Sequence, residues 1–101
     1  MSDHTELSDE EVDKKMQDLE IWGTMGDKLA TNIEFNNYKE AVFFANMIYS
    51  LAEKHTHHPR VTVEYGAVKV DVETHEADAI TDADFEMAKA IEEALGSTEW
   101  G

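Results

Sequence analysis

The sequence predicts an α+β fold in which residues 1–101 form one domain, a four-stranded antiparallel sheet with helices packed on one face. Short stretches of alternating apolar residues indicate strands with one buried face, and longer stretches with apolar residues at helical spacing indicate helices. In chain order these stretches give α-β-β-α-β-β-α. A chain of 101 residues suffices for one small domain and not for two.

The chain is expected to begin with a short helix and a β-hairpin. Residues 8–11 read Ser-Asp-Glu-Glu, a capping box that satisfies N–H groups at a helix start, and apolar residues at helical spacing continue to Leu19. A turn around Gly26 then precedes residues 29–35, where apolar and polar residues alternate. This alternation predicts a strand with one buried face.

A second helix is expected to start at Asn36 or Asn37 and to run to about Lys54. Glu40 stands three residues after Asn37, as in a capping box. The helix is apolar nearly all round, which indicates burial on more than one side. One side would pack on the sheet. The other would face either a second subunit or a flap of loop, and the pattern does not choose between them.

A second hairpin and a last helix complete the predicted fold. Alternating residues 61–65 and 68–72 flank a Gly66-Ala67 turn, and Tyr65 shares the parity of buried valines, which is typical of a core residue. The last helix is expected to open with a capping box at Thr81 and to stop at Gly96. Residues 1–7 and 97–101 are expected to be flexible.

The charge balance narrows the possible partners. The chain has 23 acidic residues against 8 basic ones, a formal net charge of −15, so nucleic-acid phosphates would be repelled. The acids are spread along the chain, as in the proteins of a salt-adapted organism. An acidic patch for a basic partner would need a local cluster, which only the first dozen residues approach. We expect self-repulsion to weaken the fold at low ionic strength.

Membrane insertion and disulfide chemistry are not expected. No stretch has the apolar length of a transmembrane helix, and residues 1–11 are acidic and polar, unlike a signal peptide. The absence of cysteine excludes disulfides and thiolate metal sites and fits a cytoplasmic protein. So small a domain buries a modest core, which favours a homodimer or homotetramer.

Histidines are the residues most suggestive of chemistry. His57 and His58 directly precede Pro59 at the start of one hairpin strand, and His75 follows the end of its partner. Because these two ends lie side by side in a hairpin, the three imidazoles would converge. Imidazoles titrate near neutral pH, so converging histidines suit proton transfer to and from one substrate.

The histidines have two other interpretations. A metal site built from His55, His57, His58 and His75 would use a common ligand type, but no helical His-x-x-x-His pair, cysteine or ordered acid set completes it. A solvated surface cluster without a role is the second. We expect no metal and no cofactor.

Residues 53–84 resemble the signature of the pterin-4a-carbinolamine dehydratase family. The matching positions are Glu53, His57, His58, Pro59, Tyr65, Thr74, His75 and Asp84. The resemblance extends to the family's first helix at 7–19, to Trp22, and to its last helix at 81–91. Nearly the whole chain is covered.

The resemblance implies a 4a-hydroxytetrahydrobiopterin dehydratase. Members of the family convert 4a-hydroxytetrahydropterin to quinonoid dihydropterin and so recycle the pterin cofactor of aromatic amino acid hydroxylases, without a metal or redox group. His57 and His75 would form the acid–base pair, in an order that the sequence does not settle. His58 would mainly bind the pterin.

The resemblance assigns further site residues. Asp84 joins the histidines in catalysis, and substrate binding falls to Glu53, His58, Pro59 and Thr74. Asp84 also stands three residues after Thr81, so capping a helix and orienting a histidine are compatible roles. Glu53 would either hold the tautomer of a histidine or lie on the helix surface.

Departures from the family pattern concern the expected pocket wall. Asp78 and Ala79 replace two glycines, Thr31 replaces a basic residue and Val61 an aromatic one. They bear on substrate preference more than on reaction class. Some family members are dimerisation cofactors of a transcription factor, so the alternatives are a non-catalytic binding module of a regulatory protein and a pterin-binding protein linked to molybdenum-cofactor metabolism.

Overall fold

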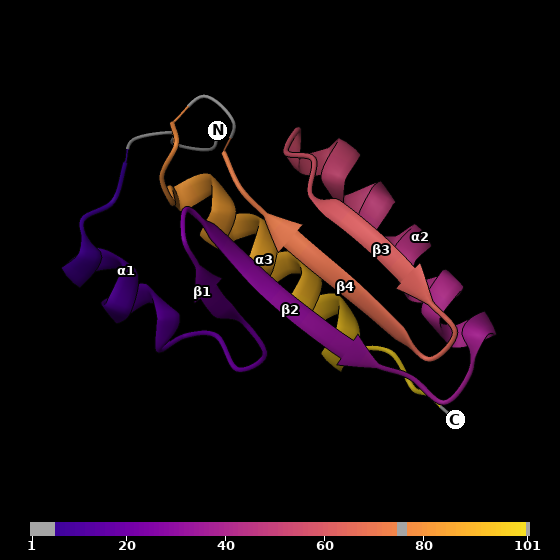
Figure 1. Cartoon of the computed structure of the whole chain (residues 1–101). Helices are drawn as coiled ribbons and strands as arrows, with labels where there is room; N and C mark the ends of the chain where they lie inside the picture. The colour runs from indigo at the N-terminus through magenta and orange to yellow at the C-terminus, as the bar shows by residue number, and fades with distance from the viewer. Residues whose placement is uncertain (1–5, 75–76, 101) are drawn as a thin grey trace.

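The computed structural model describes residues 6–74 and 77–100, which form three helices and a four-stranded sheet (Figure 1). The elements are α1 (Asp9–Met16), β1 (Gly23–Met25), β2 (Lys28–Glu34), α2 (Tyr38–His55), β3 (Arg60–Glu64), β4 (Ala67–Val72) and α3 (Asp82–Gly96). This order confirms the predicted α-β-β-α-β-β-α arrangement.

The sheet is antiparallel throughout, with strand order β1-β2-β4-β3. Its centre is the β2–β4 pair, which joins the two hairpins from Leu29 opposite Val72 to Glu34 opposite Ala67. Side chains alternate in direction along a strand, so every second residue of this pair faces the helices and is buried. Helix α2 lies along β3 and β4, and α3 lies behind the centre of the sheet (Figure 1).

The helix starts follow the predicted capping chemistry. The backbone N–H of Glu11 donates to the Ser8 hydroxyl at 3.2 Å, and the N–H of Ser8 donates to the Glu11 carboxylate at 2.9 Å. At α2, Asn37 is the N-cap, because its side chain accepts from the N–H of Glu40 at 2.9 Å. Helix α1 ends at Met16, before the last apolar residue expected in its stripe.

One local prediction was wrong, and another was confirmed. Tyr65 is 76% exposed, because β3 ends at Glu64 and the tyrosine lies in the turn that follows, where strand parity no longer applies. The last helix ends at Gly96, as predicted, and Ser97 is its C-cap.

Both ends of the described chain contact the rest of the fold. The N–H of Leu7 donates to the carbonyl of Ile80 at 3.1 Å. Near the other end, the ring of Trp100 packs edge-on against Phe35, with 4.9 Å between ring centroids, and against Phe43 and Phe44. The Trp100 indole N–H donates to the carbonyl of Leu95 at 3.2 Å.

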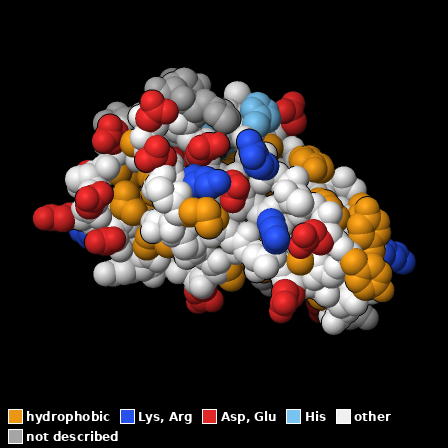
Figure 2. All heavy atoms as spheres, in the orientation of Figure 1, with side chains coloured by type: hydrophobic (Ala, Val, Ile, Leu, Met, Phe, Trp, Pro, Cys, Tyr) orange, Lys and Arg blue, Asp and Glu red, His pale blue; other side chains and the backbone are white. Residues whose placement is uncertain are grey.

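The charged and apolar surfaces are distributed unevenly. Figure 2 shows acidic side chains most densely around α1, whereas hydrophobic side chains gather where α2 lies. On α2, at least half of the surface of Tyr38, Phe43 and Tyr49 is exposed. Within the described residues, no helix has the length and apolar character needed to cross a membrane.

Candidate active site

His57 reaches the interior because the chain reverses directly after α2. The C-cap Thr56 has a φ of 53°, in the left-handed region that β-branched residues rarely adopt. This turn lets the N–H of His57 donate to the carbonyl of Ala52 at 3.1 Å. The imidazole is thereby buried, with 7% of the residue exposed. Unusual backbone conformations of this kind tend to occur at functional sites.

The buried imidazole of His57 meets a buried carboxylate. Its Nε2 lies 2.8 Å from Oδ1 of Asp84, in the first turn of α3, and the Asp84 side chain is fully buried. A negative charge is favoured at this position because the partial charge of the helix dipole is positive at its N-terminus.

Among the described residues, the Asp84 carboxylate has three hydrogen-bond partners. Beside His57, the Thr74 hydroxyl donates to Oδ1 at 3.1 Å and the backbone N–H of Thr81 donates to Oδ2 at 2.9 Å. The hydroxyls of Thr74 and Thr81 lie 2.8 Å apart, and both residues are buried. Asp84 therefore both caps α3 and contacts a histidine, the two roles that the sequence left compatible.

His58 pairs with a carboxylate at the surface. Its Nε2 lies 2.9 Å from Oε2 of Glu53, but the two side chains are 63% and 81% exposed. Glu53 thus contacts a histidine and also lies on the helix surface. Pro59 follows, half-buried, and leads into β3. The two adjacent histidines have carboxylate partners in very different surroundings.

The predicted third histidine, His75, lies outside the described residues, so its convergence with the other two stays a prediction. The described chain flanks its position on both sides. Thr74 and Ala79 form an isolated bridge, and the N–H of Ala77 donates to the carbonyl of Thr74 at 3.1 Å. Asp78 has a φ of 49°, a conformation that favours glycine.

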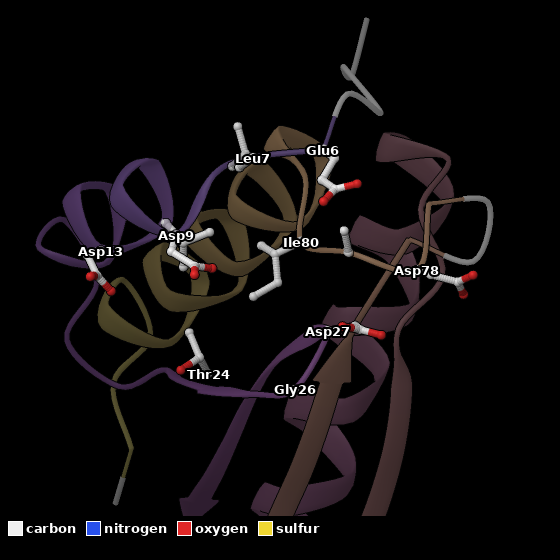
Figure 3. A pocket seen from close by; sticks show the side chains of 11 residues that line it. Glu6, Leu7, Asp9, Asp13, Thr24, Gly26, Asp27, Asp78 and Ile80 are labelled. Carbon is white, nitrogen blue, oxygen red and sulfur yellow. The ribbon is translucent and has the colours of Figure 1, made fainter.

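A hollow of about 440 Å³ lies between residues 78–80, the start of α1 and the β1–β2 turn (Figure 3). Its carboxylates come from Glu6, Asp9, Asp13, Asp27 and Asp78. Its described lining includes Asp78 and Ala79, which the sequence placed in the expected pocket wall, but none of the predicted catalytic or substrate-binding residues. In residues 6–74 and 77–100, no group of three or more histidines and acids is placed to hold a metal ion.

Sequence reasoning missed two features of this site. It did not identify Thr81 as more than a helix cap, and it assigned no role to Thr56. A signal for Thr81 existed, since a hydroxyl residue three positions before an acid predicts a cap whose carboxylate is held in place. The left-handed conformation of Thr56 has no such signal, because threonine is not typical of that region.

The model of the family described as Pterin 4 alpha carbinolamine dehydratase matches residues 5–94. The chain belongs to this family. Curated relatives named for pterin-4-alpha-carbinolamine dehydratase include one from Aquifex aeolicus, 41% identical over 89 residues, which are 88% of this chain and 90% of the relative. Another, from Sulfurisphaera tokodaii, is 36% identical over 89 residues, 88% of this chain and 96% of that protein.

Solved structures agree with this membership of the pterin-4-alpha-carbinolamine dehydratase family. A crystal structure described as a transcriptional coactivator/pterin dehydratase from Brucella melitensis matches with a TM-score of 0.82 and 25% identity, over 86% of this chain and 95% of that one. A pterin dehydratase-like protein described as a RuBisCO assembly factor of the alpha-carboxysome has the same fold, with a TM-score of 0.64 and 17% identity over 79% of this chain and 95% of that one.

Proposed function

We propose that this protein dehydrates 4a-hydroxytetrahydropterins to quinonoid dihydropterins by histidine acid–base catalysis, as a 4a-hydroxytetrahydrobiopterin dehydratase. The observation that carries the proposal is the buried His57–Asp84 pair, with 2.8 Å between Nε2 and Oδ1. An imidazole held by a buried carboxylate is suited to general acid–base work, because its orientation and tautomer are fixed before substrate arrives.

The reaction needs two proton transfers and no electron transfer. A base takes the proton from N5, the N5–C4a double bond forms, the C4a–O bond breaks, and an acid protonates the departing hydroxyl so that water leaves. We assign His57 and His75 as this pair, in either order. Each well-placed proton transfer contributes about 10²- to 10⁴-fold in rate. No metal or redox cofactor takes part in these steps.

Substrate binding falls to the exposed end of the site. His58 would contact the pterin, oriented by the Glu53 carboxylate at 2.9 Å, and Pro59 would form part of the wall. A pterin ring is flat and carries N–H donors and ring acceptors, which suits an imidazole and a carboxylate that water still reaches. Thr74, assigned to binding by the family resemblance, is buried and donates its proton to Asp84, which supports a role behind His57 instead.

A coupled assay tests the function. An aromatic amino acid hydroxylase generates the 4a-hydroxytetrahydropterin in high salt, and the decay of its absorbance is followed with and without this protein. We expect faster decay, lost in His57→Ala and in His75→Ala but kept in His55→Ala, a matched change of a histidine at the end of α2. A protein that is folded by circular dichroism and does not accelerate decay would refute the proposal.

The exposed aromatic residues of α2 favour self-association as a part of the functional state. Tyr38, Phe43 and Tyr49 are each at least half exposed on this helix, although large aromatic side chains usually bury their surface. We propose a homodimer or homotetramer that covers them. Light scattering on the purified protein tests this, and a monomer at assay concentration would contradict it. The same surface could serve a binding module, the alternative if dehydration fails.

A further inference from the structure

Four buried groups form a hydrogen-bonded chain whose proton directions can be worked out. The chain runs from the Thr81 hydroxyl to the Thr74 hydroxyl, then to the Asp84 carboxylate and on to His57. A hydroxyl has one proton to donate, and an ionised carboxylate has none. The direction of each hydrogen bond in this chain is therefore fixed by the carboxylate of Asp84, which can only accept.

Both oxygens of the Asp84 carboxylate accept hydrogen bonds. The carboxylate lies in the first turn of α3, where the helix dipole favours an anion, and its Oδ2 accepts a hydrogen bond from the backbone N–H of Thr81. Thr74 and His57 share the other oxygen, Oδ1. Full burial of the carboxylate is tolerated because three donors replace its water shell.

The proton positions follow from that acceptor. Thr74 donates its only hydroxyl proton to Oδ1, so its oxygen must accept from the Thr81 hydroxyl 2.8 Å away. Nε2 of His57 faces the same carboxylate oxygen at 2.8 Å, so Nε2 must carry a hydrogen. A neutral imidazole has one N–H only, which makes Nδ1 its basic nitrogen.

We propose that Thr74 and Thr81, acting through Asp84, hold His57 as the Nε2–H tautomer, so that Nδ1 is the nitrogen that exchanges a proton with the pterin. The assignment of the tautomer rests on the hydrogen bonds alone, and the role of Nδ1 in turnover also rests on the proposed dehydration. Thr74 and Thr81 are positioning residues in this scheme, because they act on His57 through the carboxylate.

The two threonines are also well placed along the chain for this task. Thr74 follows the end of β4, and Thr81 is the N-cap of α3, so their hydroxyls join the two sides of the segment that contains His75. The same contact therefore fixes the Asp84 carboxylate from the strand side and from the helix side. A valine has nearly the shape of threonine but cannot donate a hydrogen bond, so a threonine-to-valine substitution tests the contact with little change in packing.

Nitrogen-15 NMR of the histidine rings measures the tautomer without substrate, at a pH well above the ordinary imidazole pKa of about 6.5. The His57 signals are assigned by their loss in His57→Ala. We expect the Nε2–H pattern in the native protein. An Nδ1–H pattern there would overturn the inference, even in an active enzyme. A failed dehydration assay with an Nε2–H pattern would instead overturn only the proposed function.

Asp84→Asn provides a second, sharper arm. The backbone N–H of Thr81 can only donate, so the introduced amide must place its oxygen at the Oδ2 position. Its NH₂ group then faces Nε2 of His57, which must become an acceptor. We expect the tautomer to switch to Nδ1–H and turnover to fall at least about 10²-fold, as expected when an acid–base group is misaligned. A retained Nε2–H pattern in a folded variant would contradict the chain of donors.

Thr74→Val keeps the test decisive if Asp84→Asn does not fold. Removal of one donor from Oδ1 should strengthen the remaining bond from His57, so the Nε2–H proton resonance should move downfield, and kcat should fall while KM changes little. Thr74→Ser should keep the native resonance position and the native kcat, since it keeps the hydroxyl. An unmoved resonance in Thr74→Val would show that Thr74 fills space only and would overturn its positioning role.

Discussion

Nε2 of His57 lies 2.8 Å from Oδ1 of Asp84, although the two residues are 27 positions apart in the sequence. The His58–Glu53 pair is five positions apart and almost equally short, at 2.9 Å. Exposure separates the two pairs. The first pair is buried and the second is mostly exposed to water. We therefore expect removal of the first pair to lower stability, and removal of the second to affect substrate binding with little change in stability.

Asp84→Ala should strongly destabilise the fold. The change leaves three donors without their acceptor, from His57, Thr74 and the Thr81 backbone, and each buried unsatisfied group costs about 1–3 kcal/mol. We expect a loss of at least about 3 kcal/mol in the free energy of unfolding, measured with urea. Asp82→Asn is the matched control, because its ion pair with Lys15 is partly exposed and is worth under about 1 kcal/mol. Equal losses would show that the buried network contributes nothing.

Glu53→Gln should separate binding from stability. Exposed ion pairs contribute at most about 1 kcal/mol, so the melting temperature should hardly change. If His58 binds the pterin with the help of this carboxylate, KM should rise several-fold with little change in kcat. Glu64→Gln, which removes the exposed partner of Lys69 away from the site, should leave both kinetic constants unchanged. A fall in kcat alone would place Glu53 in catalysis.

Trp100→Ala should weaken the fold despite its place beside the C-terminus. The indole makes edge contacts with Phe35, Phe43 and Phe44, and aromatic pairs contribute about 0.5–1.5 kcal/mol each beyond their buried area. We expect a loss of about 1–3 kcal/mol by urea denaturation. Trp100→Phe should retain most of it. An unchanged unfolding curve for the alanine variant would confirm the sequence-based expectation that this end is flexible.

Stability should rise with salt. A formal charge of −15 on 101 residues opposes the compact state, and the screening length falls from about 10 Å at 0.1 M to about 3 Å at 1 M salt. We expect the circular-dichroism melting temperature to increase over this range. The salt should be sodium chloride, because sulfate salts also strengthen apolar burial and would raise the melting temperature for that separate reason. A cooperative melt in dilute buffer that salt does not shift would contradict salt adaptation.

The start of α1 should lose its cap at acid pH. Hydrogen bonds from the backbone N–H and then the hydroxyl of Ser8 lower the pKa of Glu11 below its usual 4.5. Because the folded-state pKa is the lower one, this stabilisation is complete above 4.5 and is lost as pH falls through the lowered pKa. An NMR titration of the Ser8 amide should show that midpoint, and Glu11→Gln should abolish it. A midpoint at or above 4.5 would contradict the capping box.

The order of elements and most of their bounds were predictable from the sequence, because the signals are local. Alternation marked β2 and β4, helical spacing marked α2 and α3, and the residues that cap helices at Ser8 and Asn37 act within four positions. The burial of Tyr65 was predicted wrongly because the alternation of side chains along a strand does not indicate where the strand ends.

The sequence by itself also determined the family, since the residues of the motif stand at fixed spacing along the chain. Only the tertiary structure decided how they meet. The burial of His57 depends on the left-handed turn at Thr56, and its pairing with Asp84 depends on how α3 lies behind the sheet. Hydrogen bonds also join Thr74 and Thr81 to the Asp84 carboxylate of this pair. Such contacts join distant segments, and a spacing rule that acts along the chain cannot specify which atoms face each other across a packed core.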